Sequence, residues 1–214
     1  MDNIKYKGFE IEVSRDDYPE SPREWDNLGT IICFHKRYTL GDTTKQISDS
    51  IGYALDQSQF GNWSEMYSYL QGKDARIIIP IYMYDHSGIT INTTGYSCPW
   101  DSGQVGYIFI TARKIRREYS VKRITSKLLD QVRKLLLSEV TIYDSYLRGD
   151  VYGYDIEGIE DGSCSGYFGL DYMISEAQSN IDYHIKYMRD QHYKKVKAWI
   201  RGHVSFEHRS PLTC

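Results

Sequence analysis

Residues 124–147 read ITSKLLDQVRKLLLSEVTIYDSYL, and the spacing of their apolar side chains predicts one long helix. These apolar residues recur three or four positions apart and so share one helix face: Leu128, Val132, Leu135, Leu136, Val140, Tyr143 and Leu147. Thr125 precedes the run and can accept a hydrogen bond from a free amide of the first turn, while Gly149 follows it where a left-handed C-terminal cap is favoured. The same kind of spacing predicts a second long helix over residues 175–199.

Short strands are predicted on both sides of the first helix. They are rich in β-branched and aromatic residues and are bounded by turn residues, and they cover residues 6–13, 30–38, 75–84, 89–94, 105–111, 151–157 and 165–170. Residues 14–29 are polar and contain two prolines, so we expect a long loop there. Because strands and helices do not alternate strictly, we predict an α+β fold in which a mostly antiparallel sheet is covered by two long helices.

No internal repeat or change in composition marks a domain boundary, and 214 residues suffice for one domain with a sizeable core. We therefore expect a single domain over residues 1–214. Within it, residues 1–111 are expected to be mainly strands and loops, residues 112–200 mainly helical, and residues 201–214 a polar tail.

The composition excludes several classes of protein. Apolar residues make up 41% of the chain, which excludes wholesale disorder, and no apolar run is long enough for a membrane span. A net charge of −3 excludes a globally basic nucleic-acid binder and a strongly acidic DNA mimic. The four cysteines form no Cys-x-x-Cys pair, and the N-terminal segment lacks the apolar stretch of a signal peptide. We expect a protein of the cytosol that has no membrane partner.

Tyrosine is unusually frequent, with 20 Tyr against 6 Phe. Tyrosine offers a large contact area at low rotamer entropy, which is typical of binding surfaces. The alternative interpretation is that tyrosine replaces phenylalanine at half-buried positions of the sheet, where aromatic side chains are favoured. The composition leaves both interpretations open.

Charge is segregated along the chain even though its sum is small. Residues 113–134 contain nine Lys or Arg against two acids, whereas residues 139–161 contain seven acids against one Arg. The basic stretch supplies most of the candidate binding residues: Arg113, Lys114, Arg116, Arg117, Tyr119, Lys122 and Arg123. Clustered cations attract anionic partners such as phosphates or an acidic protein surface. The alternative is a solvated helix face that is balanced by the protein's own acids.

Cysteine and histidine residues suggest one possible metal site. Cys33 and His35 are two positions apart on a predicted strand and so point to the same face. Together with His86 and Cys98 they form a Cys2His2 set, whose chemistry suits zinc. The competing interpretation is that Cys33 is a small core residue and His35 an ordinary sheet residue, in which case no cofactor is required.

Two further catalytic arrangements can be drawn from the same loops. Cys98 with His86, and with Asp85 or Asp101 as the orienting carboxylate, has the residue types of a nucleophilic hydrolase. Asp26, Asp85 and Asp101 could instead hold a divalent ion for phosphodiester hydrolysis, or simply stabilise turns. No glycine-rich phosphate loop and no G-x-S-x-G nucleophile elbow is present.

Three motifs carry a resemblance to a known group of proteins. DNLGT (26–30), YDHSGIT (84–90) and CPWDSGQVG (98–106) make most of residues 1–170 similar to a family of uncharacterised phage and mobile-element proteins. The resemblance assigns no catalytic residue. It implies a small accessory protein in the host cytosol, and proteins in that setting often counter host defences by binding a CRISPR effector, a nuclease or a signalling nucleotide.

Three functional hypotheses follow. The first is a non-enzymatic inhibitor, similar to an anti-CRISPR protein, that binds a host defence protein or nucleoprotein effector through the basic stretch. The second is a nucleotide-binding protein, or a metal-dependent hydrolase acting on a signalling nucleotide or nucleic acid, with these residues around a metal or phosphate: Asp26, His35, Asp85, His86, Cys98 and Asp101. The third is a scaffold protein of phage replication or assembly.

Overall fold

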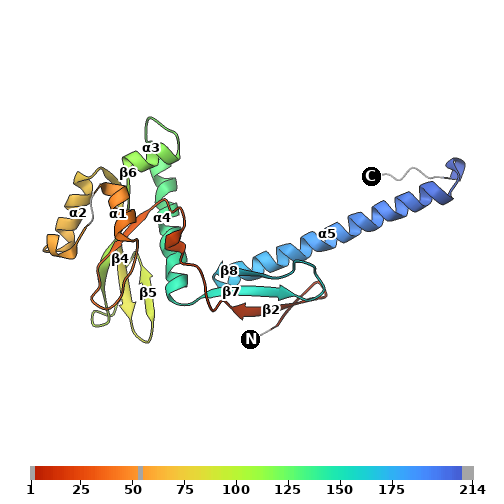
Figure 1. The fold of residues 1–214 in the computed structure, drawn as a ribbon, viewed down its shortest axis with the longest axis horizontal. Coiled ribbons are helices and arrows are strands. Elements are labelled where there is room, and N and C mark those ends of the chain that lie inside the picture. The colour runs from red at the N-terminus through yellow and green to blue at the C-terminus, as the bar shows by residue number, and fades with distance from the viewer. Residues whose placement is uncertain (1–2, 53–54, 209–214) are drawn as a thin grey trace. The chain divides into compact units, whose positions relative to one another are not determined.

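The computed structural model describes residues 3–52 and 55–208, and contacts within the chain divide it into two compact units (Figure 1). One unit comprises the residues up to Asp16 together with those from Val151 onward, and the other runs from Asp17 to Asp150. Each unit contains a four-stranded antiparallel sheet and one long helix, which confirms the α+β class. The strands predicted as one sheet form two, because the N-terminal strands pair with those that follow Val151.

The unit from Asp17 to Asp150 is built on a sheet in the order β3-β6-β4-β5. Its strands are β3 (Thr30–Cys33), β4 (Ala75–Asp85), β5 (Ile89–Asn92) and β6 (Ser102–Thr111). Its helices are α1 (Thr44–Ile51), α2 (Trp63–Gly72), α3 (Ala112–Glu118) and α4 (Ser126–Leu147), with short 3-10 turns at Pro22–Glu24 and Gln57–Gln59.

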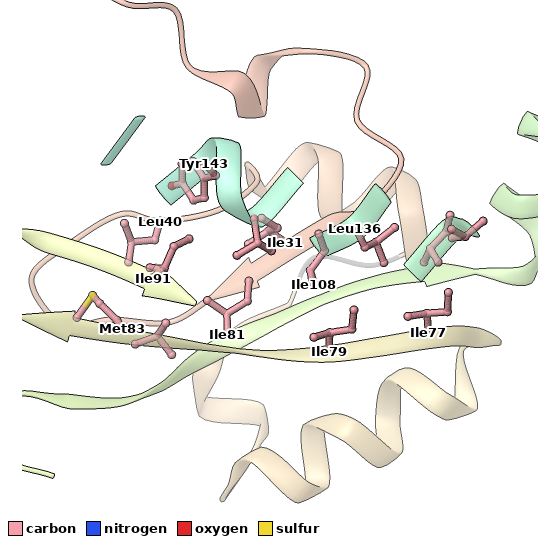
Figure 2. Packing of buried hydrophobic residues seen from close by; sticks show 14 of the residues in the cluster. Ile31, Leu40, Ile77, Ile79, Ile81, Met83, Ile91, Ile108, Leu136 and Tyr143 are labelled. Carbon is pink, nitrogen blue, oxygen red and sulfur yellow. The ribbon is translucent and has the colours of Figure 1, made fainter. Parts of the chain in front are cut away.

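The two faces of this sheet pack against different helices. One face presents Ile79, Ile81 and Ile108 to Leu136 of α4, as Figure 2 shows. The opposite face presents Ile32 and Phe109 to residues of α1 and α2 such as Ile47, Met66 and Leu70. Neighbouring isoleucines Ile31 and Ile32 therefore enter different cores, as the alternation of side chains along a strand requires.

Helix α4 begins and ends as its sequence predicts. The Thr125 hydroxyl accepts a hydrogen bond from the Leu128 amide at 3.3 Å, and Gly149 adopts a left-handed conformation with φ of 68°. Leu128, Val132 and Leu136 are buried, whereas Leu135 is exposed. The helix covers the sheet along the rest of the predicted face, but the assignment of Leu135 to that face is wrong.

The direction of the strands gives this sheet two distinct ends. Because β6 is antiparallel to both β3 and β4, the start of β3 lies near the end of β6, and α3 follows β6 directly. At the opposite end, the end of β4 pairs with the start of β6, with Tyr84 opposite Ser102. We call these the α3 end and the Asp85 end.

The second unit has the strand order β1-β2-β7-β8. Its strands are β1 (Ile4–Tyr6), β2 (Phe9–Arg15), β7 (Val151–Ile156) and β8 (Cys164–Phe168), and they are followed by α5 (Leu170–His203) and a 3-10 turn at Phe206–His208. Ile11, Tyr154 and Ile156 of the sheet pack against Met173, Ala177 and Ile181, all in the first part of α5. The helix predicted over 175–199 is therefore longer at both ends.

Candidate functional site

A cleft of about 470 Å³ lies at the α3 end of the sheet in the unit from Asp17 to Asp150. Three segments form its walls: the loop that precedes β3, helix α1, and the first turns of α3. The lining residues are Arg23, Trp25, Asp26, Asn27, Gly29, Thr30, Asp42, Gln46, Asp49, Ser50, Thr111, Arg113, Lys114 and Arg117. A cavity of this size accommodates a ligand of nucleotide dimensions.

The floor of the cleft is a buried ion pair. Arg23 is 4% exposed, and its Nε donates a hydrogen bond to Asp42 Oδ1 at 2.6 Å. Its Nη2 donates to the carbonyl oxygen of Gly29 at 2.8 Å, and its Nη1 lies 3.3 Å from Glu139 Oε2. Burial opposes the charge of Arg23, but the hydrogen bonds and charges of Asp42 and Glu139 outweigh it and raise the pKa of the guanidinium. Arg23 is thus neutralised by the protein itself.

Glu139 connects helix α4 to the loop that precedes β3. Its carboxylate accepts hydrogen bonds from the amides of Leu28 at 2.7 Å and Gly29 at 3.1 Å. Burial raises the pKa of Glu139, although the charge of Arg23 and the two amides act in the opposite direction. The DNLGT motif is therefore fixed in place by an acid more than a hundred residues away in the sequence.

Helix α3 brings cations to the wall of the cleft. The half-buried Lys114 donates from Nζ to the carbonyl oxygen of Asn27 at 2.6 Å, and no carboxylate in the described residues forms an ion pair with it. Burial lowers the pKa of Lys114, which the charges of Glu139 and Asp26 partly offset. An ammonium group with one carbonyl partner retains donors for an anionic ligand.

Two arginines extend this cationic wall. Arg113 Nη2 donates to the carbonyl oxygen of Ser50 at 3.4 Å, whereas Arg117 is paired with the neighbouring Glu118 at 2.7 Å. Asp26 and Asp49 add carboxylates to the same cleft. The lining therefore combines donors for phosphate oxygens with acceptors for hydroxyl or amino groups.

An aromatic ring completes the cleft. Trp25 is 41% exposed and belongs to the loop that also supplies Asp26 and Asn27. An exposed indole beside cations can stack on the flat face of a base. With the donors and acceptors already described, the cleft offers one kind of contact for each part of a nucleotide.

The Asp85 end holds four of the predicted site residues, Asp85, His86, Cys98 and Asp101. His86 Nδ1 lies 3.5 Å from Asp101 Oδ2, and Cys98 Sγ lies 3.8 Å from the same oxygen. Asp85 forms an ion pair with Arg37 and accepts a hydrogen bond from the Tyr38 hydroxyl at 3.3 Å. The three predicted metal-binding aspartates therefore do not converge, since Asp26 lies at the α3 end while the other two lie at this one.

The zinc set finds no support in the geometry of the described residues, where no three His, Cys, Asp or Glu side chains are grouped so as to hold a metal ion. His35 stacks on the Tyr38 ring at 5.1 Å, and its Nδ1 accepts a hydrogen bond from the Arg37 amide at 3.3 Å. Cys33 packs against the core, and burial raises the pKa of its thiol to about 12. Both residues fit the structural interpretation.

The arrangement of Cys98, His86 and Asp101 lacks the contact between nucleophile and base that a nucleophilic hydrolase needs. Asp101 is the group that both Cys98 and His86 approach, and no hydrogen bond joins these two in the part of the chain that the structure describes. A thiol needs an adjacent base to become a nucleophile by that route. The structure therefore brings the three expected residues together, but with Asp101 between the other two instead of His86 between Cys98 and the carboxylate.

The basic stretch is divided between the cleft and the rest of the surface. Arg113, Lys114 and Arg117 line the cleft, whereas Arg116, Lys122 and Arg123 are exposed outside its lining. Tyr119 is half-buried and packs against the core. Sequence reasoning missed Arg23, Asp42 and Glu139, because none of them belongs to a local motif and their contacts join distant segments.

No family model matches the chain, and no match was found among curated proteins or solved structures. None of the described helices is both long enough and apolar enough to cross a lipid bilayer.

Proposed function

We propose that this protein binds a phosphorylated small molecule of the nucleotide class in the cleft at the α3 end. The observation that carries the proposal is the position of Arg113, Lys114 and Arg117 in the same cleft as the indole of Trp25. Lysine and arginine are the usual ligands of phosphate groups, and an aromatic ring is a usual platform for a base.

Each part of such a ligand has a matching group. The Lys114 ammonium is held at the carbonyl of Asn27, so it needs little reorganisation to meet a phosphate oxygen. Arg113 can add a second, forked contact to the phosphate. Asp26 and Asp49 can accept hydrogen bonds from ribose hydroxyls or from amino groups of a base.

The buried pair on the floor supports this use of the cleft. Asp42 and Glu139 compensate the charge of Arg23 within the protein, so Arg23 fixes the surrounding backbone and is not itself a ligand for an anion. The cations that face a ligand are then those of α3. The buried residues around Arg23 therefore support the cleft, whereas the cations of α3 contact the ligand.

The test is calorimetric titration with ATP, AMP, inorganic pyrophosphate and adenosine. We expect the nucleotides to bind, pyrophosphate to bind more weakly because it lacks the base, and adenosine to bind weakly or not at all. Replacement of both Arg113→Gln and Lys114→Gln should weaken ATP binding at least tenfold, since each lost charged hydrogen bond contributes on the order of 1.5–3 kcal/mol. Absence of binding by all four compounds would overturn the proposal.

The control is a matched pair of substitutions in the same basic stretch. Lys122→Gln and Arg123→Gln remove the same number of charges from positions outside the cleft lining. This variant should bind ATP as the unchanged protein does. An equal loss in both variants would mean that general electrostatic attraction, rather than the cleft, accounts for the binding.

In the phage setting that the sequence resemblance implies, such a site would allow the protein to sequester a signalling nucleotide. Hydrolysis of a bound nucleotide and inhibition by direct contact with a defence protein or nucleoprotein effector both stay predictions. Product analysis during the ATP titration tests the first. Capture of a purified effector, compared between the unchanged protein and the Lys122→Gln and Arg123→Gln variant, tests the second.

A further inference from the structure

Helix α5 is longer than the sheet it packs on. All of its buried residues, Met173, Ala177 and Ile181, lie in its first twelve positions. The next turn still contacts the sheet, through the 2.7 Å ion pair of Lys7 with Asp182 and the edge-on packing of Phe9 against His184. Residues 185–203 then continue as helix past the sheet, as the blue helix of Figure 1 shows. At 1.5 Å per residue this part is about 28 Å long.

The projecting part carries a charge opposite to that of the whole chain. Residues 185–203 contain six Lys or Arg and one Asp, a net charge of +5, whereas the whole chain has −3. An isolated helix with this charge attracts a polyanion and repels a second copy of itself. Charge complementarity therefore favours an anionic polymer as its partner.

One side of α5, which begins at Tyr183 just before the projecting part and continues along it, combines aromatic rings with cations. Tyr183, Tyr187, Lys194 and Lys197 are separated by four, seven and three positions, so they follow one another along one side of the helix. The rings of Tyr183 and Tyr187 lie 6.5 Å apart and within 20° of parallel, and they are 70% and 49% exposed. Asp190 lies in the same row and is its one acid.

We propose that this face of α5 binds single-stranded nucleic acid. Unpaired bases stack on exposed aromatic rings whatever their sequence, and lysines beside them contact the phosphates. The two near-parallel tyrosines distinguish this partner from an acidic protein, for which the lysines alone would suffice. The bases of a duplex are already stacked on each other and cannot use the rings in this way.

The test measures fluorescence anisotropy of a labelled 20-nucleotide oligo(dT) at several salt concentrations. Lys194→Gln with Lys197→Gln should reduce the salt slope by about 1.4, since each phosphate contact in a single strand contributes about 0.7. Tyr183→Leu with Tyr187→Leu should weaken binding about tenfold and leave the salt slope unchanged, because stacking involves no counterion release. Asp190→Asn should strengthen binding by removing the one acid of the row.

Two controls accompany these measurements. Circular dichroism confirms that each variant retains its helix, and Leu and Gln are both good helix formers. Lys114→Gln, a substitution in the cleft, should leave oligo(dT) binding unchanged. Failure of α5 to bind oligo(dT) and failure of the cleft to bind a nucleotide can therefore be told apart.

The proposal is overturned if oligo(dT) does not bind, if the tyrosine variant binds as well as the unchanged protein, or if a 20-base-pair duplex or polyglutamate binds more tightly. Sedimentation of the unbound protein reports whether the opposite face, with Met188 and Trp199, instead joins two copies. A stable dimer that excludes oligo(dT) would likewise overturn it.

Discussion

The guanidinium group of Arg23 joins its own loop to two segments that lie 19 and 116 positions away in the sequence. It contacts Asp42 before α1, Glu139 in α4 and the carbonyl of Gly29 before β3. A charge this deeply buried is tolerated only when its partners compensate the loss of water. Asp42 in turn accepts the amide of Ile31 at 3.0 Å, which extends the network into the first strand of the sheet.

Replacement of Arg23 by Met should destabilise the protein strongly. The substitution leaves the carboxylates of Asp42 and Glu139 buried without a counter-charge. Removing one partner of a buried ion pair typically lowers the free energy of unfolding by about 3–5 kcal/mol. Urea unfolding measures the loss. Arg76→Met is the matched control, because Arg76 pairs with Asp74 at the surface and such pairs contribute less than about 1 kcal/mol. Equal losses in the two variants would contradict the structural role of the buried pair.

Lys114 should make stability and ligand binding respond to pH in opposite directions. Its pKa in the folded protein is lowered below the ordinary 10.5 by burial, so between the two values the unfolded chain binds more protons. The free energy of unfolding should therefore rise with pH across that range.

Affinity for ATP should fall over the same range, since the neutral amine no longer attracts phosphate. Calorimetry and urea unfolding at matched pH values check both trends. Lys114→Arg, which keeps its charge, should retain ATP affinity at high pH; a parallel decline in this variant would assign the pH dependence to another group.

Individual residues of the candidate site were only partly predictable. Arg113, Lys114 and Arg117 stand out in the sequence as members of a basic stretch, and Asp26 belongs to a distinctive motif. Arg23 lies in a polar, proline-containing segment that resembles an ordinary loop. Its partners lie 19 and 116 positions away, and no local pattern encodes contacts of that range.

At the scale of elements, β3 and β6 approach unusually closely at Gly106. A Cβ atom on Gly106 would lie 1.9 Å from the carbonyl oxygen of Ile32, so no side chain fits without separating the two strands. Gly103 lies in the same strand, yet a Cβ there would meet nothing within 4 Å. The CPWDSGQVG motif thus contains two glycines with different structural requirements.

Gly106→Ala should destabilise the protein by about 1–3 kcal/mol or more, as overpacking of a fixed backbone does. Gly103→Ala serves as the control and should be nearly neutral. Thermal unfolding followed by circular dichroism compares the two. If both variants unfold at the same temperature, the close approach of β3 and β6 is not the reason for glycine at position 106.

The predictability of an element depended on its length and periodicity. Helix α4 was predicted with its cap because 22 residues repeat one apolar face over six turns. Helix α3 has only seven residues, and its sequence reads as a charge run. Strands β7 and β8 were predicted within one or two residues, but which sheet they join depends on pairing with β2, more than a hundred positions away.

At the scale of the whole molecule, one compact unit is inserted into the other. The unit from Asp17 to Asp150, which we call the inner unit, is inserted into the unit that contains both ends of the given chain, which we call the outer unit. The Asp16 amide donates a hydrogen bond to the carbonyl oxygen of Val151 at 2.9 Å, so the chain leaves and re-enters the outer unit at adjacent positions. Composition does not change at either position, which is why the sequence predicts one domain. Each unit has its own sheet and its own buried cluster.

A chain of residues 17–150 should therefore fold without the rest of the protein. All residues of its two core clusters lie between positions 17 and 150. The residues that flank it, Asp16 and Val151, are hydrogen-bonded to each other, so the two ends of the fragment lie close together. Circular dichroism and cooperative thermal unfolding of the isolated fragment test this. A fragment that lacks a cooperative transition would instead favour the single domain that the sequence predicts.

The Asp16–Val151 connection also sets an order for biosynthesis. Strands β1 and β2 leave the ribosome before the inserted unit, but a lone hairpin is marginally stable in water, and β7 is translated only after the inserted unit is complete. The inner unit can thus close its core while the N-terminal hairpin still waits for its neighbour. Strand β2 is thus made before the inserted unit and can pair with β7 only after that unit has been made.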